Sequence, residues 1–158
     1  MATWDQFAAA SPLVARGRER LGIGLAYLAT VRRGGAPRLH LVSPIFADGR
    51  LFLAISGDSP KRWDLANDGR YALHALPPDP GDAGYDEFEF NITGRARRIP
   101  NADEATWAAV RAGAGHVIHD DDWLFQLDVA VATTTVWTGL GVPDQPPMPS
   151  RDLWCDGE

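Results

Sequence analysis

The sequence contains a single cysteine and no long apolar segment. Cys155 is the only cysteine among the 158 residues, so no disulfide can form within the chain and a zinc site built from several cysteines is excluded. No apolar run is long enough to span a bilayer, and the first residues do not combine a basic segment with an apolar one as a signal peptide does. We therefore expect a cytoplasmic protein that does not enter a membrane.

Basic residues are fewer than acidic ones. Lys and Arg together number 15, against 21 Asp and Glu, which gives a net charge of −6 with neutral histidines. Nucleic-acid backbones are bound by clustered Lys and Arg, so nucleic acid is not expected as the main partner. The hydrophobic fraction of 45% and the charged fraction of 23% are typical of a globular protein. At this length we expect one domain, which buries roughly 70% of its unfolded surface.

Motifs of several common activities are missing or incomplete. No Gly-x-Ser-x-Gly sequence surrounds a serine, so an α/β-hydrolase is not indicated. The Gly-x-Gly sequences at 22–24 and 113–115 lack the third glycine and the strand–helix context of a dinucleotide-binding fingerprint. His116 and His119, followed by three aspartates, are a candidate metal pair. The glycines before them and the strand expected directly after them favour an acid-rich turn instead.

Apolar segments separated by turn residues predict a mainly β, α+β protein. Strands are expected at 25–33, 38–47, 50–56, 70–77, 87–99 and 123–137, and helices at 3–22 (in two pieces), after Ser59 and at 101–112. Two-residue turns at Gly34–Gly35 and Asp48–Gly49 join three strands in succession, which favours an antiparallel barrel over a ferredoxin-like sandwich. Residues 1–142 are expected to form the single domain. Residues 143–158 are a Pro-rich tail, either an arm on a partner or disordered.

The segment RLHLVSPIFADGRLFLAISGDSPKRWDLANDG gives the strongest indication of function. Ser59 is a natural N-cap and Pro60 suits the first helical position, so Lys61 and Arg62 fall in the first turn of a helix. Cations there are unfavourable by roughly 0.3–1 kcal/mol each, because they face the positive end of the helix dipole. A bound phosphate would make the same cations favourable. Arg38 could supply a third cation, so the segment predicts a phosphorylated ligand.

The order of these features over residues 22–77 resembles the flavin-binding core of the pyridoxamine 5'-phosphate oxidase-like split barrels. A strand ends in a Gly turn, the next begins with Pro-Arg, an Asp-Gly turn follows, and a further strand leads to Ser-x-Lys-Arg. The resemblance implies a six-stranded antiparallel split β-barrel with peripheral helices that forms a homodimer, with FMN in the groove between the subunits. It implies an FMN-dependent oxidoreductase acting on a small molecule. A deazaflavin-dependent reductase using the same groove, or a flavin- or haem-binding protein without turnover, stays open.

The same resemblance implies which residues contact the cofactor. Arg38 matches the strand arginine that pairs with the FMN phosphate, and Lys61 and Arg62 match the basic pair at the loop and helix start. The other implied contacts follow the same strands and the loop between them: His40, Val42, Ile55, Ser56 and Ser59. No residue is assigned as a catalytic acid or base, and no metal is expected.

The chain departs from the true oxidases near its end. Those enzymes use an arginine–histidine pair for the substrate phosphate and ring, whereas MPSRDLWCDGE contains Arg151 without an adjacent histidine. The substrate of those oxidases is therefore not expected here. Trp63 and Trp137 are candidates to face a flavin from the partner subunit. His74, in the fourth expected strand, is either structural or close to the flavin.

Overall fold

The structure is a computed structural model that describes residues 1–76, 88–139, 144 and 146–157. Its helices are α1 (Trp4–Ala10), α2 (Leu13–Leu21), α3 (Lys61–Asn67) and α4 (Glu104–Gly113). Its strands are β1 (Ala26–Val31), β2 (Pro37–Val42), β3 (Ile45–Ala47), β4 (Arg50–Ile55), β5 (Arg70–Ala75), β6 (Phe88–Arg98), β7 (Trp123–Thr138) and β8 (Met148–Cys155). The expected α+β class is confirmed. The expected strand ends at 77 and 87 lie outside the described residues.

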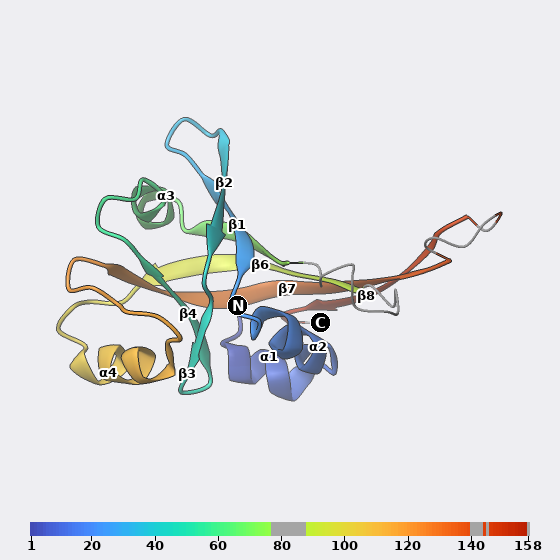
Figure 1. The fold of residues 1–158 in the computed structure, drawn as a ribbon, viewed down its shortest axis with the longest axis horizontal. Helices are drawn as coiled ribbons and strands as arrows, with labels where there is room; N and C mark the ends of the chain where they lie inside the picture. The colour runs from blue at the N-terminus through green and yellow to red at the C-terminus, as the bar shows by residue number, and fades with distance from the viewer. Residues whose placement is uncertain (77–87, 140–143, 145, 158) are drawn as a thin grey trace.

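One antiparallel sheet carries the fold, with the hydrogen-bonded order β2-β1-β5-β6-β7-β4-β3 and with β8 paired to β7. β2 and β3 stand at opposite ends of this order, yet only Ser43 and Pro44 separate them along the chain. The sheet must therefore curl until its two ends meet at this link, where β2 leads down into β3 in Figure 1. Since proline has no N–H to donate, Pro44 interrupts the strand expected at 38–47 and divides it in two.

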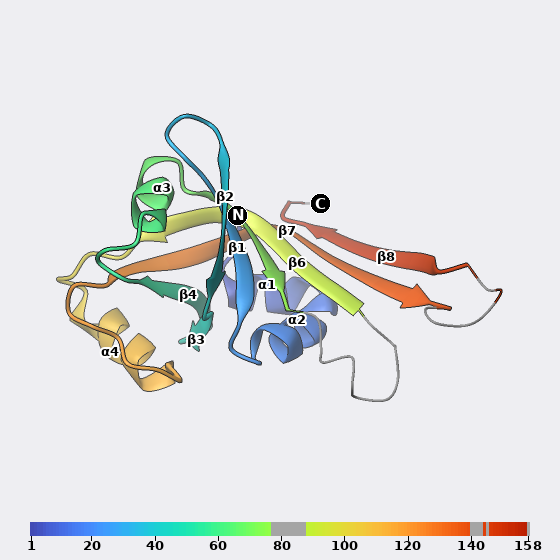
Figure 2. The same ribbon diagram turned by 45° about the horizontal axis from the view of Figure 1, so that its top comes forward.

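The Pro-rich tail contains a strand. β8 pairs with β7 from Val131↔Cys155 to Thr138↔Met148. The segment that the sequence left as an arm on a partner or as disorder is therefore paired within its own chain. With the division at Pro44, it raises the number of strands from the six expected to eight. Figure 2 shows β7 and β8 leaving the body together, on the side away from α3 and α4.

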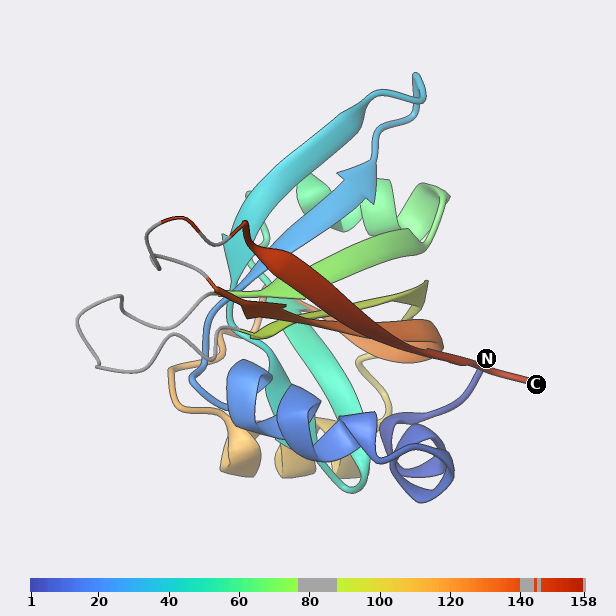
Figure 3. The same ribbon diagram turned by 90° about the vertical axis from the view of Figure 1, so that its right-hand side faces the viewer.

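In Figure 3, α1 and α2 (blue) and α4 (orange) lie at the bottom of the view, and α3 (green) lies in its upper part. α1 is capped by Thr3, whose backbone N–H donates to the side-chain oxygen of Gln6 at 2.8 Å, and the helix buries Trp4 and Phe7 in the larger core. α4 is capped by Asp103, so it begins later than the helix expected at 101–112, and it packs in a second apolar cluster. Within the described ranges no helix has the length and apolar character needed to cross a bilayer.

Gly94 allows β6 and β7 to approach closely. The register between these strands shifts between Thr93 and Gly94, which marks a β-bulge. A Cβ atom on Gly94 would collide with the carbonyl oxygen of Asp128. Only glycine, which has no Cβ atom, therefore fits at this position without displacing β7, and the bulge bends β6 here.

Candidate cofactor-binding site

The predicted strand residues share one face of β2. Arg38 lies opposite Thr30 of β1, and His40 lies opposite Leu28. Directly opposed residues of antiparallel strands point to the same side of the sheet, and Leu28 is completely buried. Arg38, His40 and Val42 therefore point to the inner side, where Val42 joins the core and Arg38 lies at the rim.

Arg38 is held by a carboxylate that sequence reasoning missed. Its Nε donates to Oδ2 of Asp64 on α3 at 2.7 Å, and the Thr30 hydroxyl donates to the same oxygen at 2.9 Å. Asp64 is only 6% exposed. A guanidinium has five N–H donors and this bond uses one, so Arg38 is fixed in place with donors left for a ligand. In the sequence, the only indication that Asp64 belongs to the site was its position three residues after Lys61 on the same helix, which places the two side chains on neighbouring positions of the helix surface.

Lys61 is partly withdrawn from water beside Ser59. Its Nζ donates to the Ser59 hydroxyl at 3.0 Å. Burial lowers the pKa of Lys61, and the charge of Asp58 acts in the opposite direction. No carboxylate among the described residues forms an ion pair with Lys61. A bound anion would therefore compensate for the hydration that this ammonium has lost.

The start of α3 differs from the prediction. The helix begins at Lys61 with Pro60 in the N-cap position, and no side chain caps it. Ser59 is therefore not the cap, because its hydroxyl accepts from Lys61 instead. In the loop before it, Ser56 donates to Oδ1 of Asp58 at 2.6 Å, and this bond is the main cause of the lowered pKa of Asp58.

Two predicted contacts are core residues. Val42 is 7% exposed and Ile55 is 1% exposed. Both side chains belong to the larger apolar cluster. Any contact that Val42 or Ile55 makes with a ligand would therefore come from its main chain.

Arg62 turns to a different group of residues. Its Cζ lies 4.9 Å from the ring centroid of Trp63 and 5.0 Å from that of Trp123. Lys61 and Arg38, by contrast, both act electrostatically on His40. The charges of Arg38 and Lys61 thus both reach His40, whereas the Arg62 guanidinium lies against the indole rings of Trp63 and Trp123.

His40 lies among these charges with an unused ring nitrogen. Burial lowers the pKa of His40 below 6.5, and the positive charges of Lys61, Arg38 and Arg32 lower it further, while Asp64 raises it. Its Nε2 atom is buried and has no hydrogen-bond partner in the part of the chain that the structure describes. A buried nitrogen without a partner is unfavourable and marks a place where a ligand could bind.

The free protein should become less stable in mild acid because of His40. In the unfolded chain this imidazole takes up a proton near pH 6.5, whereas in the folded protein its lowered pKa keeps it neutral to a lower pH. The free energy of unfolding should therefore fall as the pH is lowered from 7 through 6.5. Urea unfolding of His40→Gln should show a weaker pH dependence over this window. His116→Gln, on an exposed histidine between α4 and β7, is the control, and an unchanged slope in His40→Gln would contradict the assignment.

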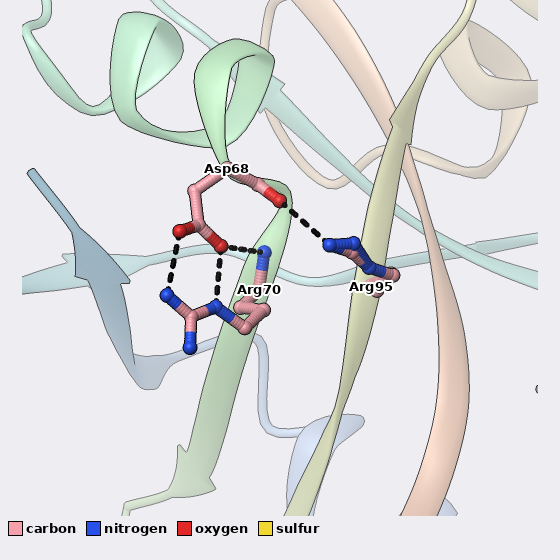
Figure 4. Close-up of polar contacts among 3 residues, drawn as sticks. All are labelled: Asp68, Arg70 and Arg95. Atoms are coloured by element: carbon pink, nitrogen blue, oxygen red, sulfur yellow. Dashed lines mark hydrogen bonds and ion pairs between the residues drawn. The ribbon is translucent and has the colours of Figure 1, made fainter. Parts of the chain in front are cut away.

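The far end of α3 is fixed by a separate group of charges (Figure 4). Asp68 accepts from Arg70 Nε at 2.6 Å and from its Nη2 at 2.7 Å, and the Asp68 carbonyl accepts from Arg95 at 3.3 Å. The bond to Arg70 lowers the pKa of Asp68 to about 2. Gly69, with a φ of 72°, turns the chain directly after the helix. α3 is thus attached to β5 and β6 at one end and to Arg38 through Asp64.

The other histidines lie outside this group. His74 points to the outer side of β5, with Nδ1 2.7 Å from the Ala75 carbonyl oxygen. At His119 the backbone N–H donates to Asp122, which closes a turn. Among the described residues no three His, Cys, Asp or Glu side chains form a metal-binding group.

Comparison with known proteins identifies the fold. No protein-family model matches the chain, and no curated protein matches its sequence. A haem-binding protein of Mycobacterium smegmatis matches at a TM-score of 0.60 and 18% identity, over 89% of this chain and 58% of that one. HutZ, the haem storage protein of Vibrio cholerae, matches at 0.60 and 17%, over 92% and 93%. A pyridoxamine 5'-phosphate oxidase-related, FMN-binding protein of Nostoc punctiforme matches at 0.59 and 14%, over 91% and 97%.

These similarities define a class of fold. The chain has the α+β split-barrel fold of the pyridoxamine 5'-phosphate oxidase-like proteins, as the sequence resemblance implied. It spans little more than half the length of the mycobacterial protein. Solved structures with this fold include proteins described as FMN-binding and proteins described as haem-binding. The fold therefore leaves the ligand to be argued from the side chains of this chain.

Proposed function

We propose that the protein is a cytoplasmic, homodimeric flavoprotein that binds FMN and oxidises or reduces a small molecule. The observation that carries the proposal is the group around His40. Arg38, held in place by Asp64, and His40, with an unpartnered imidazole nitrogen, lie on the inner side of β2, and the partly desolvated Lys61 at the start of α3 acts on His40 through its charge. Arg38, Lys61 and His40 together suit a bound anion whose oxygens accept hydrogen bonds.

The residues fit the FMN phosphate. Arg38 and Lys61 would bind its oxygens through charge-assisted hydrogen bonds, which are the stronger class of hydrogen bond in proteins. Arg62 would add positive charge at the first turn of α3. Ser56, Ser59 and the main chain at Ile55 and Val42 would flank the rest of the cofactor. Bound FMN would supply the redox chemistry, while the protein supplies binding, orientation and electrostatics.

A second copy of the chain is the proposed partner because the outer side of the sheet carries two neighbouring rows of uncharged residues with exposed leucines at their ends. Two rows of cross-strand neighbours run over this outer sheet face: Leu41, Tyr27, His74, Asn91, Thr133 and Leu153, and beside them Leu39, Ala29, Ala72, Thr93, Val131 and Cys155. Neither row contains Asp, Glu, Lys or Arg. Leu39 and Leu153 are each 64% exposed in the single chain. A continuous face of this kind is typical of an interface, and the fold resemblance implies a groove for FMN beside it.

Haem is the competing ligand because His40 also suits it. A buried imidazole nitrogen without a partner is the type of group that ligates haem iron. The surrounding cations raise the cost of any added positive charge near His40 and favour a dianionic phosphate instead. We therefore place FMN first, with a deazaflavin as the alternative flavin.

Titration of the apoprotein with FMN, a deazaflavin and haem tests the proposal. Absorption spectra separate the three complexes, and FMN should bind at one molecule per chain. The flavin in the complex should then be reduced by a chemical reductant and reoxidised. Tight binding of haem with no uptake of either flavin would overturn the proposal, and so would the absence of binding by all three.

A further inference from the structure

A second group of cations and aromatic rings lies on the other side of the α3 start. It consists of Arg62 and Trp63 on α3, Arg98 at the end of β6 and Trp123 at the start of β7. The Cζ of Arg98 lies 3.6 Å from the ring centroid of Trp123, and that of Arg62 lies 5.0 Å from it. The two indole rings pack edge to face, with centroids 4.8 Å apart. We call these four residues the indole–guanidinium cluster.

The cluster contains an exposed indole ring and two guanidinium groups without a carboxylate partner among the residues that the structure describes. Trp63 is 51% exposed, although an indole is among the largest apolar side chains. Neither Arg62 nor Arg98 forms an ion pair with a carboxylate in the described part of this acidic chain. The Nε of Arg62 is buried and has no hydrogen-bond partner among those residues. Packing of α3 on the sheet explains the burial of Trp123, but it explains neither the exposed ring nor the two unpaired cations.

Asp58 is one acidic group near this region. It is exposed, its carboxylate accepts from Ser56, and the charges of Arg62 and Lys61 lower its pKa. It lies beyond ion-pair distance of both arginines. The four residues of the cluster therefore carry a net positive charge, and they combine a half-exposed indole ring with guanidinium N–H donors.

These two properties together select a particular class of ligand. An exposed indole face stacks with planar aromatic rings, and nucleobases stack on such faces whatever their identity. Guanidinium groups that are held in place beside indoles can present their N–H donors to phosphate oxygens in a forked geometry. A nucleoside phosphate carries both features within a short distance.

We infer that the indole–guanidinium cluster binds a nucleoside phosphate, with the base stacked on Trp63 and the phosphates on Arg98 and Arg62. The site rests on side chains from α3, β6 and β7 and is separate from the group of Arg38, Lys61 and His40. Its existence does not depend on FMN binding, since the ligand contacts none of those three residues.

Binding of ADP to the purified protein tests this site. Tryptophan fluorescence and calorimetric titration should both report ADP binding. Arg98→Gln and Trp63→Leu should each weaken it by roughly tenfold or more, because they remove a charge-assisted contact and the stacking surface. Both residues are exposed, and circular dichroism should confirm that the variants are folded. Arg97→Gln is the matched control, since the neighbouring Arg97 is also exposed but points to the opposite side of β6.

Two further measurements distinguish ADP binding at the indole–guanidinium cluster from ADP binding at the FMN phosphate site. Lys61→Gln should leave ADP affinity unchanged, and pyrophosphate, which lacks a base, should bind much more weakly than ADP. The inference fails if ADP does not bind at millimolar concentration or if Arg98→Gln binds it as tightly as the unaltered protein. It also fails if pyrophosphate binds as well as ADP, or if Lys61→Gln abolishes ADP binding, because the nucleotide would then occupy the FMN phosphate site.

Discussion

Replacing both Arg38 and Lys61 by glutamine should weaken FMN binding by roughly 10²- to 10⁴-fold, since each charge-assisted hydrogen bond contributes on the order of 1.5–3 kcal/mol. Arg38 is already held by Asp64 at 2.7 Å and Lys61 is already partly desolvated, so neither must be reorganised when the phosphate enters. The quenching of FMN fluorescence on binding measures the affinity. Each single variant should show about half of the loss in binding free energy.

Removal of Arg38 leaves a buried carboxylate without its partner, and this must be separated from the loss of a ligand contact. Asp64→Asn combined with Arg38→Gln removes the uncompensated charge while keeping the shape of the Asp64 side chain. This paired variant should fold normally and still bind FMN weakly. Arg97→Gln should bind FMN like the unaltered protein. Full FMN affinity in the folded Arg38→Gln, Lys61→Gln variant would remove the phosphate assignment.

The second large effect is expected on the outer sheet face. Leu39→Arg with Leu153→Arg places two charges among uncharged residues, at positions that are each 64% exposed in the single chain. A buried, unpaired charge is strongly unfavourable at an interface. Light scattering after gel filtration should therefore give the mass of one chain, 17.2 kDa, in place of twice that value.

Val117→Arg is the matched control for this experiment. Val117 is an apolar residue that is 74% exposed and lies outside the outer sheet face, between α4 and β7. Its replacement should leave the dimer intact. The Leu39→Arg, Leu153→Arg chain should also lose FMN, because the resemblance implies a groove made by both subunits. A variant that stays dimeric, or an unaltered protein that is monomeric, would show that another surface or no surface of this chain mediates association.

The turns and strands of the fold could be predicted because their signals are local. Gly34–Gly35 and Asp48–Gly49 each require backbone conformations that few residues adopt, and Gly35, Asp48 and Gly49 have positive φ in the structure. The division at Pro44 also follows from a local property, the missing N–H. β8 was not predicted, because its prolines and charges indicate an irregular tail and only its pairing with β7 makes it a strand.

The cations of the site could be predicted from the sequence, but the contacts that these cations make could not. Cations at the start of a short helix indicated an anion without any structure, and the alternation of β2 correctly placed Arg38 and His40 on one face. The ion pair between Arg38 and Asp64 could not be predicted, because it joins residues 26 positions apart and depends on how α3 packs on the sheet. The turn of Arg62 toward Trp123 depends on the same packing.

The affinities of FMN and riboflavin for the apoprotein, measured side by side, test the central claim most directly. The two ligands share the flavin ring and the ribityl chain and differ in the phosphate. If Arg38 and Lys61 bind that phosphate, FMN should bind more tightly by roughly 10²-fold or more, and the difference should shrink in Lys61→Gln. Equal affinities for FMN and riboflavin would contradict the account, even if both bind tightly.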